Sequence, residues 1–161
     1  MRVRAKILPA SSVMPRTILT TPKAEEYVPV KLVQVGMVDE DGSEGMMVLA
    51  SLSDRERQLV MRAFSGEVAS HIDRFSKGDR SSLPTIYNIV EDMADRNGLH
   101  LVSVQIYGSN AALRGDISFE GRDKRIVLHG YRASDCVALA VLYDAPLLVQ
   151  STLLVREVPG S

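Results

Sequence analysis

Residues 131–149, YRASDCVALAVLYDAPLLV, place a polar turn directly before an apolar helix and a short apolar strand. Ser134 is the predicted N-cap, because its hydroxyl can accept hydrogen bonds from free N–H groups of the first helical turn. Asp135 would lie in that turn, where the helix dipole favours negative charge, with Arg132 just outside and within reach of its carboxylate. The helix is expected to bury four apolar positions and then to end: Val137, Ala138, Val141 and Leu142, followed by Asp144, Ala145 and Pro146.

The segment upstream predicts a hairpin followed by a helix. Residues 30–38 are rich in β-branched side chains, residues 39–42 supply turn chemistry, and residues 46–52 form a returning apolar strand. Ser53 and Glu56 match a capping box, with Ser53 as N-cap and Glu56 at the third helical position. A helix is therefore expected up to Gly66, with three inward positions: Val60, Ala63 and Phe64.

Two further helices are predicted by apolar residues at helical spacing. The first follows Gly66 and reaches about Ser76, with Val68, Ile72 and Phe75 on one face. The second runs from about residue 83 to residue 97, with four residues expected to face inward: Leu83, Ile86, Val90 and Met93.

Strands are predicted at residues 99–107, 111–120, 124–130 and 147–150. In residues 111–120 apolar and polar side chains alternate, which indicates a sheet with one covered face and one wet face. The predicted fold class is α+β, a mixed and largely antiparallel sheet of five or six strands with three to four helices. Residues 28–158 would form this domain. Residues 1–27 would be an extended arm packed on its own domain or on a neighbouring subunit.

Composition narrows the classes of protein. The chain has 161 residues with 45% hydrophobic and 24% charged side chains, which suits one globular domain. No apolar run approaches the roughly 20 residues that span a bilayer, so no membrane association is expected. Cys136 is the single cysteine, which rules out an internal disulfide and favours the reducing cytoplasm; within an apolar helix it is expected to be a buried structural thiol.

Charge is distributed unevenly along the chain. The first 24 residues carry five basic side chains and no acidic one, whereas residues 24–161 hold 14 basic and 20 acidic side chains, a balance of −6. Nucleic-acid binding usually depends on clustered Lys and Arg, so the charge of the domain does not support a nucleic-acid partner.

Carboxylates are the strongest candidates for chemistry. The three histidines lack the spacing of a zinc site, and there is no phosphate-binding Gly-rich loop. Glu56, Asp116 and Asp135 all lie near predicted strand or helix ends and could together hold Mg²⁺ or Mn²⁺ through hard oxygen ligands. Each also has a structural alternative: Glu56 in the capping box, Asp116 on the wet strand face, and Asp135 at the helix start.

The Arg132–Ala140 segment resembles the Arg-Pro-Ser-Asp-Ala-Ile-Ala-Leu-Ala motif of the bifunctional nuclease domain, with Ala133 in place of proline. The similarity extends back to about Val28. Glu56 stands where this family has a glutamate after a strand. Residues 83–90 are similar to its Arg-Pro-Leu-Thr-His-Asp-Leu-Leu run, so Tyr87 and Asn88 occupy the His-Asp positions.

The resemblance implies magnesium-dependent cleavage of RNA or DNA, with Asp135 and Glu56 as catalytic and metal-binding residues and Arg132 steadying the phosphate. Tyr87 and Asn88 cannot replace the acid–base and anionic roles of His and Asp, although together with Ser134 they could hydrogen-bond a ligand. The alternative is a non-catalytic oligomerising or regulatory module in which the Arg132–Asp135 pair is structural. A homo-oligomer is expected in either case.

Overall fold

The computed structural model describes residues 25–156, which form an α+β domain with three α-helices and eight strands in this range. The elements in chain order are β1 (Tyr27–Met37), β2 (Glu44–Ser51), β3 (Arg57–Ser65), α1 (Gly66–Ser76), α2 (Ile86–Arg96), β4 (Leu99–Ser109), β5 (Ala112–Gly121), β6 (Arg125–Arg132), α3 (Ala133–Tyr143), β7 (Leu147–Gln150), the 3-10 turn η1 (Ser151–Leu153) and β8 (Val155–Arg156).

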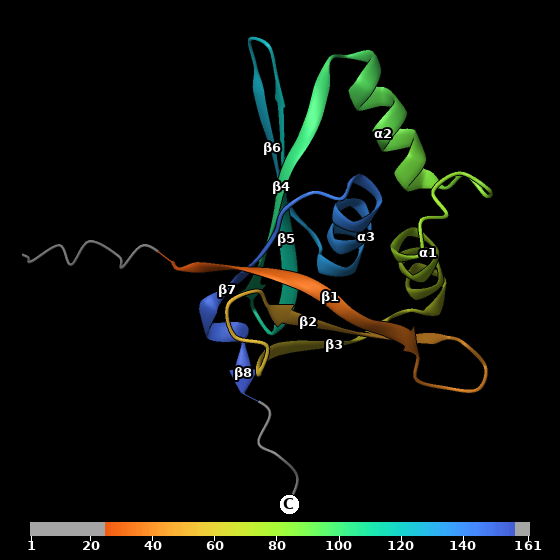
Figure 1. Cartoon of the computed structure of the whole chain (residues 1–161), viewed down its shortest axis with the longest axis vertical. Coiled ribbons are helices and arrows are strands. Elements are labelled where there is room, and N and C mark those ends of the chain that lie inside the picture. Colours follow the sequence, from red (N-terminus) through yellow and green to blue (C-terminus); the bar gives the residue numbers. More distant parts are fainter. Residues whose placement is uncertain (1–24, 157–161) are drawn as a thin grey trace, which may run out of the picture.

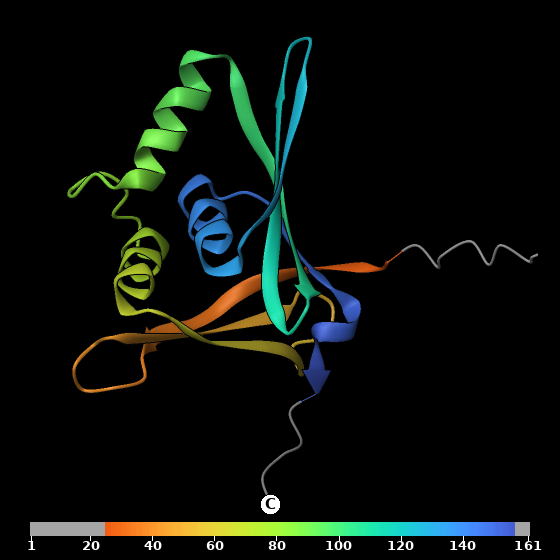
Figure 2. The same cartoon turned by 180° about the vertical axis from the view of Figure 1, so that it is seen from behind.

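All eight strands belong to one sheet in the order β6-β5-β4-β7-β1-β2-β3-β8. Neighbours are antiparallel except for β4 and β7, which run parallel. The predicted mixed, largely antiparallel α+β class is confirmed, but the expected count of five or six strands is too low. In Figure 1 the strands β4–β6 run up the view and the strands β1–β3 run across it, and Figure 2 shows the three helices on the same side of this bent sheet.

Helix α3 lies at the centre of the core. It is buried around nearly its whole circumference, because the strands β4–β6 and the helices α1 and α2 pack against it. Cys136 and Val137 on α3 are fully buried, as are Val104 and Ile106 on β4 and Val149 on β7. Strand β7 is the next strand after α3 in the chain. In the sheet it lies between β4–β6 on one side and β1–β3 with β8 on the other, so the segment that contains α3 and β7 joins the two halves of the sheet.

The start of α3 differs from the prediction. Its N-cap is Arg132, which makes no side-chain cap hydrogen bond, and Ser134 is already the second helical residue and is buried. The helix starts two residues earlier than expected because β6 continues to Arg132 and leaves no linker. Asp135 lies in the first turn as predicted, and Asp144 ends the helix in the left-handed conformation, with φ of 54°.

The predicted helix after Ser53 is wrong. Residues 57–65 form β3, which pairs with β2. Leu59 and Met61 are buried while Val60 between them is exposed, a period of two rather than 3.6. Glu56 therefore lies in the β2–β3 turn instead of completing a capping box.

Helix α1 confirms the prediction of a helix from Gly66 to Ser76, with Val68, Ile72 and Phe75 buried. Its N-cap is Ser65, whose side chain accepts a hydrogen bond from the Glu67 N–H. Most of the predicted arm, residues 1–24, lies outside the described residues, and Tyr27 already belongs to β1. No helix within residues 25–156 is long and apolar enough to cross a membrane.

Helix α2 exists as predicted but shows a different face to the core. Its buried residues are Tyr87 and Ala94. Three residues that were expected to face inward are largely exposed, with relative exposures of 60% for Leu83, 64% for Ile86 and 62% for Met93; Ile89 is 53% exposed as well. An apolar stripe at helical spacing therefore has no cover from the described part of the chain.

Candidate functional site

Asp135 is the centre of a hydrogen-bonded cluster that joins α3 to α2. Arg132 Nε donates to Asp135 Oδ2 at 2.7 Å, and the Tyr87 hydroxyl donates to Asp135 Oδ1 at 2.7 Å. Burial and the hydrogen bond to Asp135 both raise the pKa of Tyr87 well above its ordinary value, so its hydroxyl stays protonated. The predicted contact between Arg132 and Asp135 is present, and the Tyr87 position meets the same carboxylate.

Local structure fixes both sides of this cluster. Arg132 ends β6 and directly precedes α3, so its side chain and that of Asp135 lie three residues apart on one helical turn. On the other side a capping box sets the first turn of α2: Thr85 accepts from the Tyr87 N–H, and Asn88 Oδ1 accepts from the Thr85 N–H at 2.9 Å. Asn88 also donates to the Arg80 carbonyl, so its amide serves the cap rather than the groove.

The cluster borders a groove of about 790 Å³ between α1, α2, α3 and the strands β5 and β6. Its walls are mainly apolar, with Val68 from α1, Val90 from α2, Ile117 and Phe119 from β5, and Leu139 from α3. Tyr87, Arg132 and Asp135 supply polar atoms to this lining, whereas Asn88 and Ser134 do not belong to it. The volume falls within the range of roughly 300–1,000 Å³ typical of ligand sites.

His71 is a groove residue to which the sequence assigned no role. It lies on α1 and packs against the aromatic rings of Phe75 and Tyr87, with ring centroids 6.2 and 6.1 Å away. The Glu67–His71 pair at i,i+4 was the only sequence signal, and it does not reveal that α1 and α2 meet here.

Asp116 belongs to a separate cluster. The Tyr107 hydroxyl and the Gly130 N–H both donate to its Oδ1 at 3.0 Å, and His129 Nδ1 lies 2.7 Å from its Oδ2. Burial alone would raise the pKa of Asp116, but these hydrogen bonds outweigh it and the pKa is lowered. Because Ile117 and Phe119 line the groove, alternation along β5 directs Asp116 to the opposite face of the sheet.

Glu56 belongs to neither the Asp135 cluster nor the Asp116 cluster. It is exposed in the β2–β3 turn, and four strands separate β3 from β5 in the sheet. Its backbone N–H donates to Asp54 Oδ1 at 3.2 Å, which shapes the turn. The three carboxylates that the sequence grouped therefore lie in three different places.

These residues do not fit a divalent metal. Across residues 25–156 no three His, Cys, Asp or Glu side chains lie together in a way that could hold a metal ion. Both oxygens of Asp135 and both of Asp116 already accept hydrogen bonds, so neither is presented as a free ligand. A metal-assisted step cannot be derived from this arrangement.

Cys136 is fully buried next to this region, and burial raises the pKa of its thiol to about 12. A thiol that stays protonated is a poor nucleophile, which agrees with the expected structural role. A Cβ added at Gly115 would lie 2.5 Å from Cys136 Sγ, so α3 and β5 pack closely at this point.

No family model matches the chain, and no curated protein matches it in sequence. The candidate site is thus defined by geometry alone, as an apolar groove with a closed Tyr87–Asp135–Arg132 cluster on its lining.

Proposed function

We propose that this protein is a non-catalytic, self-associating regulatory module, in which the apolar stripe of α2 binds a second copy of the chain. The observation that carries the proposal is the exposure of Ile86, Ile89 and Met93, each more than half accessible on one helix. They are spaced i, i+3 and i+7, which places them on one side of α2. A contiguous exposed apolar strip of this kind is typical of interaction surfaces.

Asp135 and Asp116 favour a binding role over catalysis, because the oxygens of both carboxylates already accept hydrogen bonds. Asp135 is held by a neutral hydroxyl and by a guanidinium, an arrangement that fixes the position of α2 against α3. The balance of −6 over residues 24–161 is unfavourable for a phosphate-rich substrate. Cys136 as the single, buried thiol fits a reducing compartment, and the proposal places the protein in the cytoplasm.

Light scattering at micromolar to millimolar protein concentration tests the proposal. The wild-type mass should rise with concentration, and the double variant Ile89→Gln, Met93→Gln should stay monomeric. Asp92→Gln is the matched control, since it places the same side chain on α2 outside the stripe; it should preserve association and, by removing a like charge, strengthen it. A monomeric wild type, or a double variant that still associates, would overturn the proposal.

Salt provides a second readout of the same surface. Asp92 and Asp95 are exposed on α2 beside the stripe, so two copies would bring like charges together. Screening by salt should therefore strengthen association through α2.

A nuclease is the second candidate, because Arg132 and Asp135 both line the groove and match the bifunctional nuclease motif. We test it by incubating the protein with single-stranded RNA and DNA in Mg²⁺ or Mn²⁺, with Asp135→Asn as the control. Cleavage that is lost with EDTA and with Asp135→Asn would establish this candidate. Absence of cleavage, or cleavage that the variant retains, would exclude it.

A further inference from the structure

We propose that the groove between α1, α2 and the β5–β6 strands is the docking site of residues 1–24 of this same chain. The groove is apolar and open, and no segment within residues 25–156 fills its volume of about 790 Å³. The occupant must therefore bring apolar side chains, and its charge must suit the groove walls.

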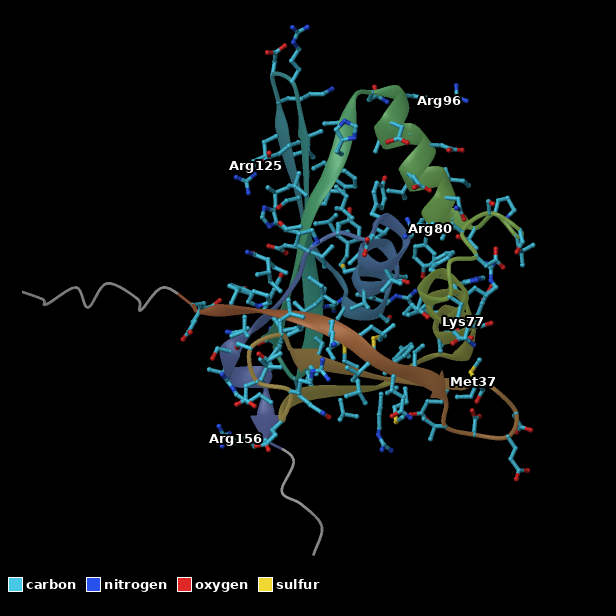
Figure 3. All side chains as sticks on the ribbon, viewed as in Figure 1. Met37, Lys77, Arg80, Arg96, Arg125 and Arg156 are labelled. Atoms are coloured by element: carbon cyan, nitrogen blue, oxygen red, sulfur yellow. The ribbon has the colours of Figure 1, made fainter. Side chains whose placement is uncertain are left out.

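The charged side chains in the groove lining are mostly acidic. Glu67 on α1 lines the groove with a side chain that is 81% exposed, and Asp135 is the second acid in the lining. The acidic residues of α2, Glu91, Asp92 and Asp95, do not belong to the lining. The basic side chains Arg80 and Arg96 lie at the two ends of α2 (Figure 3) and do not line the groove either.

The groove wall formed by β5, β6 and α3 adds no free positive charge. Its cation in the groove lining is Arg132, whose guanidinium already donates to Asp135. A docked segment with positive charge would gain from Glu67 on α1 without opposing a free cation at this wall.

Residues 1–24 have the complementary composition. They contain five basic side chains and no acidic one, and they also carry the apolar residues that a groove can bury: Val3, Ile7, Leu8, Val13, Met14, Ile18 and Leu19. Pro9, Pro15 and Pro22 interrupt any long helix, which favours an extended segment laid along a groove.

Chain length permits the contact. A segment of 24 residues spans up to roughly 80 Å when extended, at about 3.3 Å per residue. A domain of this size has a radius of gyration of about 14 Å, so the segment preceding Glu25 can reach any part of its surface.

The body of a second copy is a poorer occupant. Residues 24–161 carry a balance of −6, so a second copy of the domain is a worse electrostatic match for Glu67 in the lining than residues 1–24 are. The groove and the α2 stripe share Ile86, but Ile89 and Met93 lie outside the groove lining. Arm docking and self-association can thus be tested separately.

The experiment uses the full chain with a nitroxide spin label on Ala10→Cys. Cys136 is fully buried, so wild type should take up no label and serves as the labelling control. Amide signals of Leu83, Leu128 and Tyr131 report on the groove, and signals of Val155 and Arg156 report on β8, far from α2 in Figure 1. The expected result is loss of intensity at the groove amides with β8 unaffected.

Two variants and salt make the result specific. Leu83→Lys removes an exposed apolar side chain from the groove and opposes the basic arm, so it should abolish the selective loss of intensity, whereas Ser81→Lys, outside the lining, should preserve it. Added salt should weaken this contact, opposite to its expected effect on α2 self-association. Mixing spin-labelled unenriched protein with unlabelled ¹⁵N protein shows whether the arm belongs to the same or to a neighbouring copy.

Selective loss at the groove from the arm of the same copy would support the proposal. Equal or absent loss at groove and β8, loss that comes only from a neighbouring copy, or a groove effect that Leu83→Lys leaves unchanged, would overturn it. Neither outcome depends on the mass of the double variant Ile89→Gln, Met93→Gln, so failure of this inference is distinguishable from failure of the proposed function.

Discussion

Helices α3 and α2 have the same length, 11 residues, but opposite relations to the core. Eight residues of α3 are buried, including Cys136 and Leu142 with no exposed surface, whereas α2 buries only Tyr87 and Ala94. The apolar side chains of α3 find their partners in the sheet. On α2, Ile86, Ile89 and Met93 remain largely exposed. The comparison teaches that an apolar helical face indicates a need for a partner without showing whether that partner belongs to the same domain.

The largest expected effect comes from truncating an apolar residue on each helix. Leu142→Ala removes a fully buried side chain from α3 and should lower the free energy of unfolding by about 3 kcal/mol. Met93→Ala removes a side chain that is 62% exposed on α2 and should cost less than about 0.5 kcal/mol in the monomer. Urea unfolding at low protein concentration measures both. Equal costs would contradict the contrast between the two helices.

The junction between the helices comes next. Tyr87→Phe removes the hydrogen bond to Asp135 and should cost about 1.5 kcal/mol, because the acceptor is charged and partly buried. Tyr131→Phe is the control, since Tyr131 lines the same groove but is half-exposed. Its unfolding midpoint in urea should match wild type. If both variants behaved alike, the Tyr87–Asp135 contact would not be what fixes α2 against α3.

A smaller effect of opposite sign is expected at Tyr143, the last residue of α3. Its hydroxyl is buried and has no hydrogen-bond partner, and its ring packs edge-on against Phe119. Tyr143→Phe keeps the ring and removes the unsatisfied group, so stability should rise by up to about 1 kcal/mol. Thermal unfolding measures the change. A clear loss of stability would indicate that the hydroxyl has a partner in solution.

The smallest effect on monomer stability is expected from Ile89→Gln, on the exposed face of α2. The side chain is 53% exposed, so the free energy of unfolding should change by no more than about 0.5 kcal/mol. Circular dichroism melts of the dilute protein provide the measurement. A larger loss would mean that the stripe already has a partner within the monomer.

The sequence predicted those elements whose patterns are local and consistent. Strand β7 has the predicted bounds, and α1 and β4–β6 lie within two residues of theirs, because turn residues and clear periodicity mark both ends. Asp135 and Arg132 were paired correctly for the same reason, since three residues on one turn determine their contact. The groove could not be predicted, because α1, α2 and β5 approach only through tertiary packing.

Residues 53–65 show where local patterns mislead. Ser53 and Glu56 match a capping box, and Val60 and Phe64 match helical spacing. The observed strand is instead determined by pairing with β2, where Leu49 lies opposite Leu59 and Met47 opposite Met61. That pairing buries Leu59 and Met61, a benefit that arises between strands and is absent from the segment itself. The misplaced Glu56 in the metal prediction follows directly from this error.

Of the four residues near α2 that were predicted to face inward, Val90 packs against the core, and the prediction is wrong for Leu83, Ile86 and Met93 for a related reason. Periodicity identified Ile86, Val90 and Met93 as one face, but the helix turns Tyr87 toward the core, where its hydroxyl reaches Asp135. One buried hydrogen bond to a carboxylate on α3, together with the aromatic contacts to His71 and Phe75, accompanies this orientation.

Isoleucine methyl spectra recorded over a range of protein concentration test the central claim, that the partner of α2 lies outside its own domain. Ile89 is on the stripe, whereas Ile72 and Ile106 are fully buried in the core. We predict that the Ile89 methyl signal shifts as the concentration rises from micromolar to millimolar, while the signals of Ile72 and Ile106 stay constant. An Ile89 signal that does not change with concentration would contradict the claim.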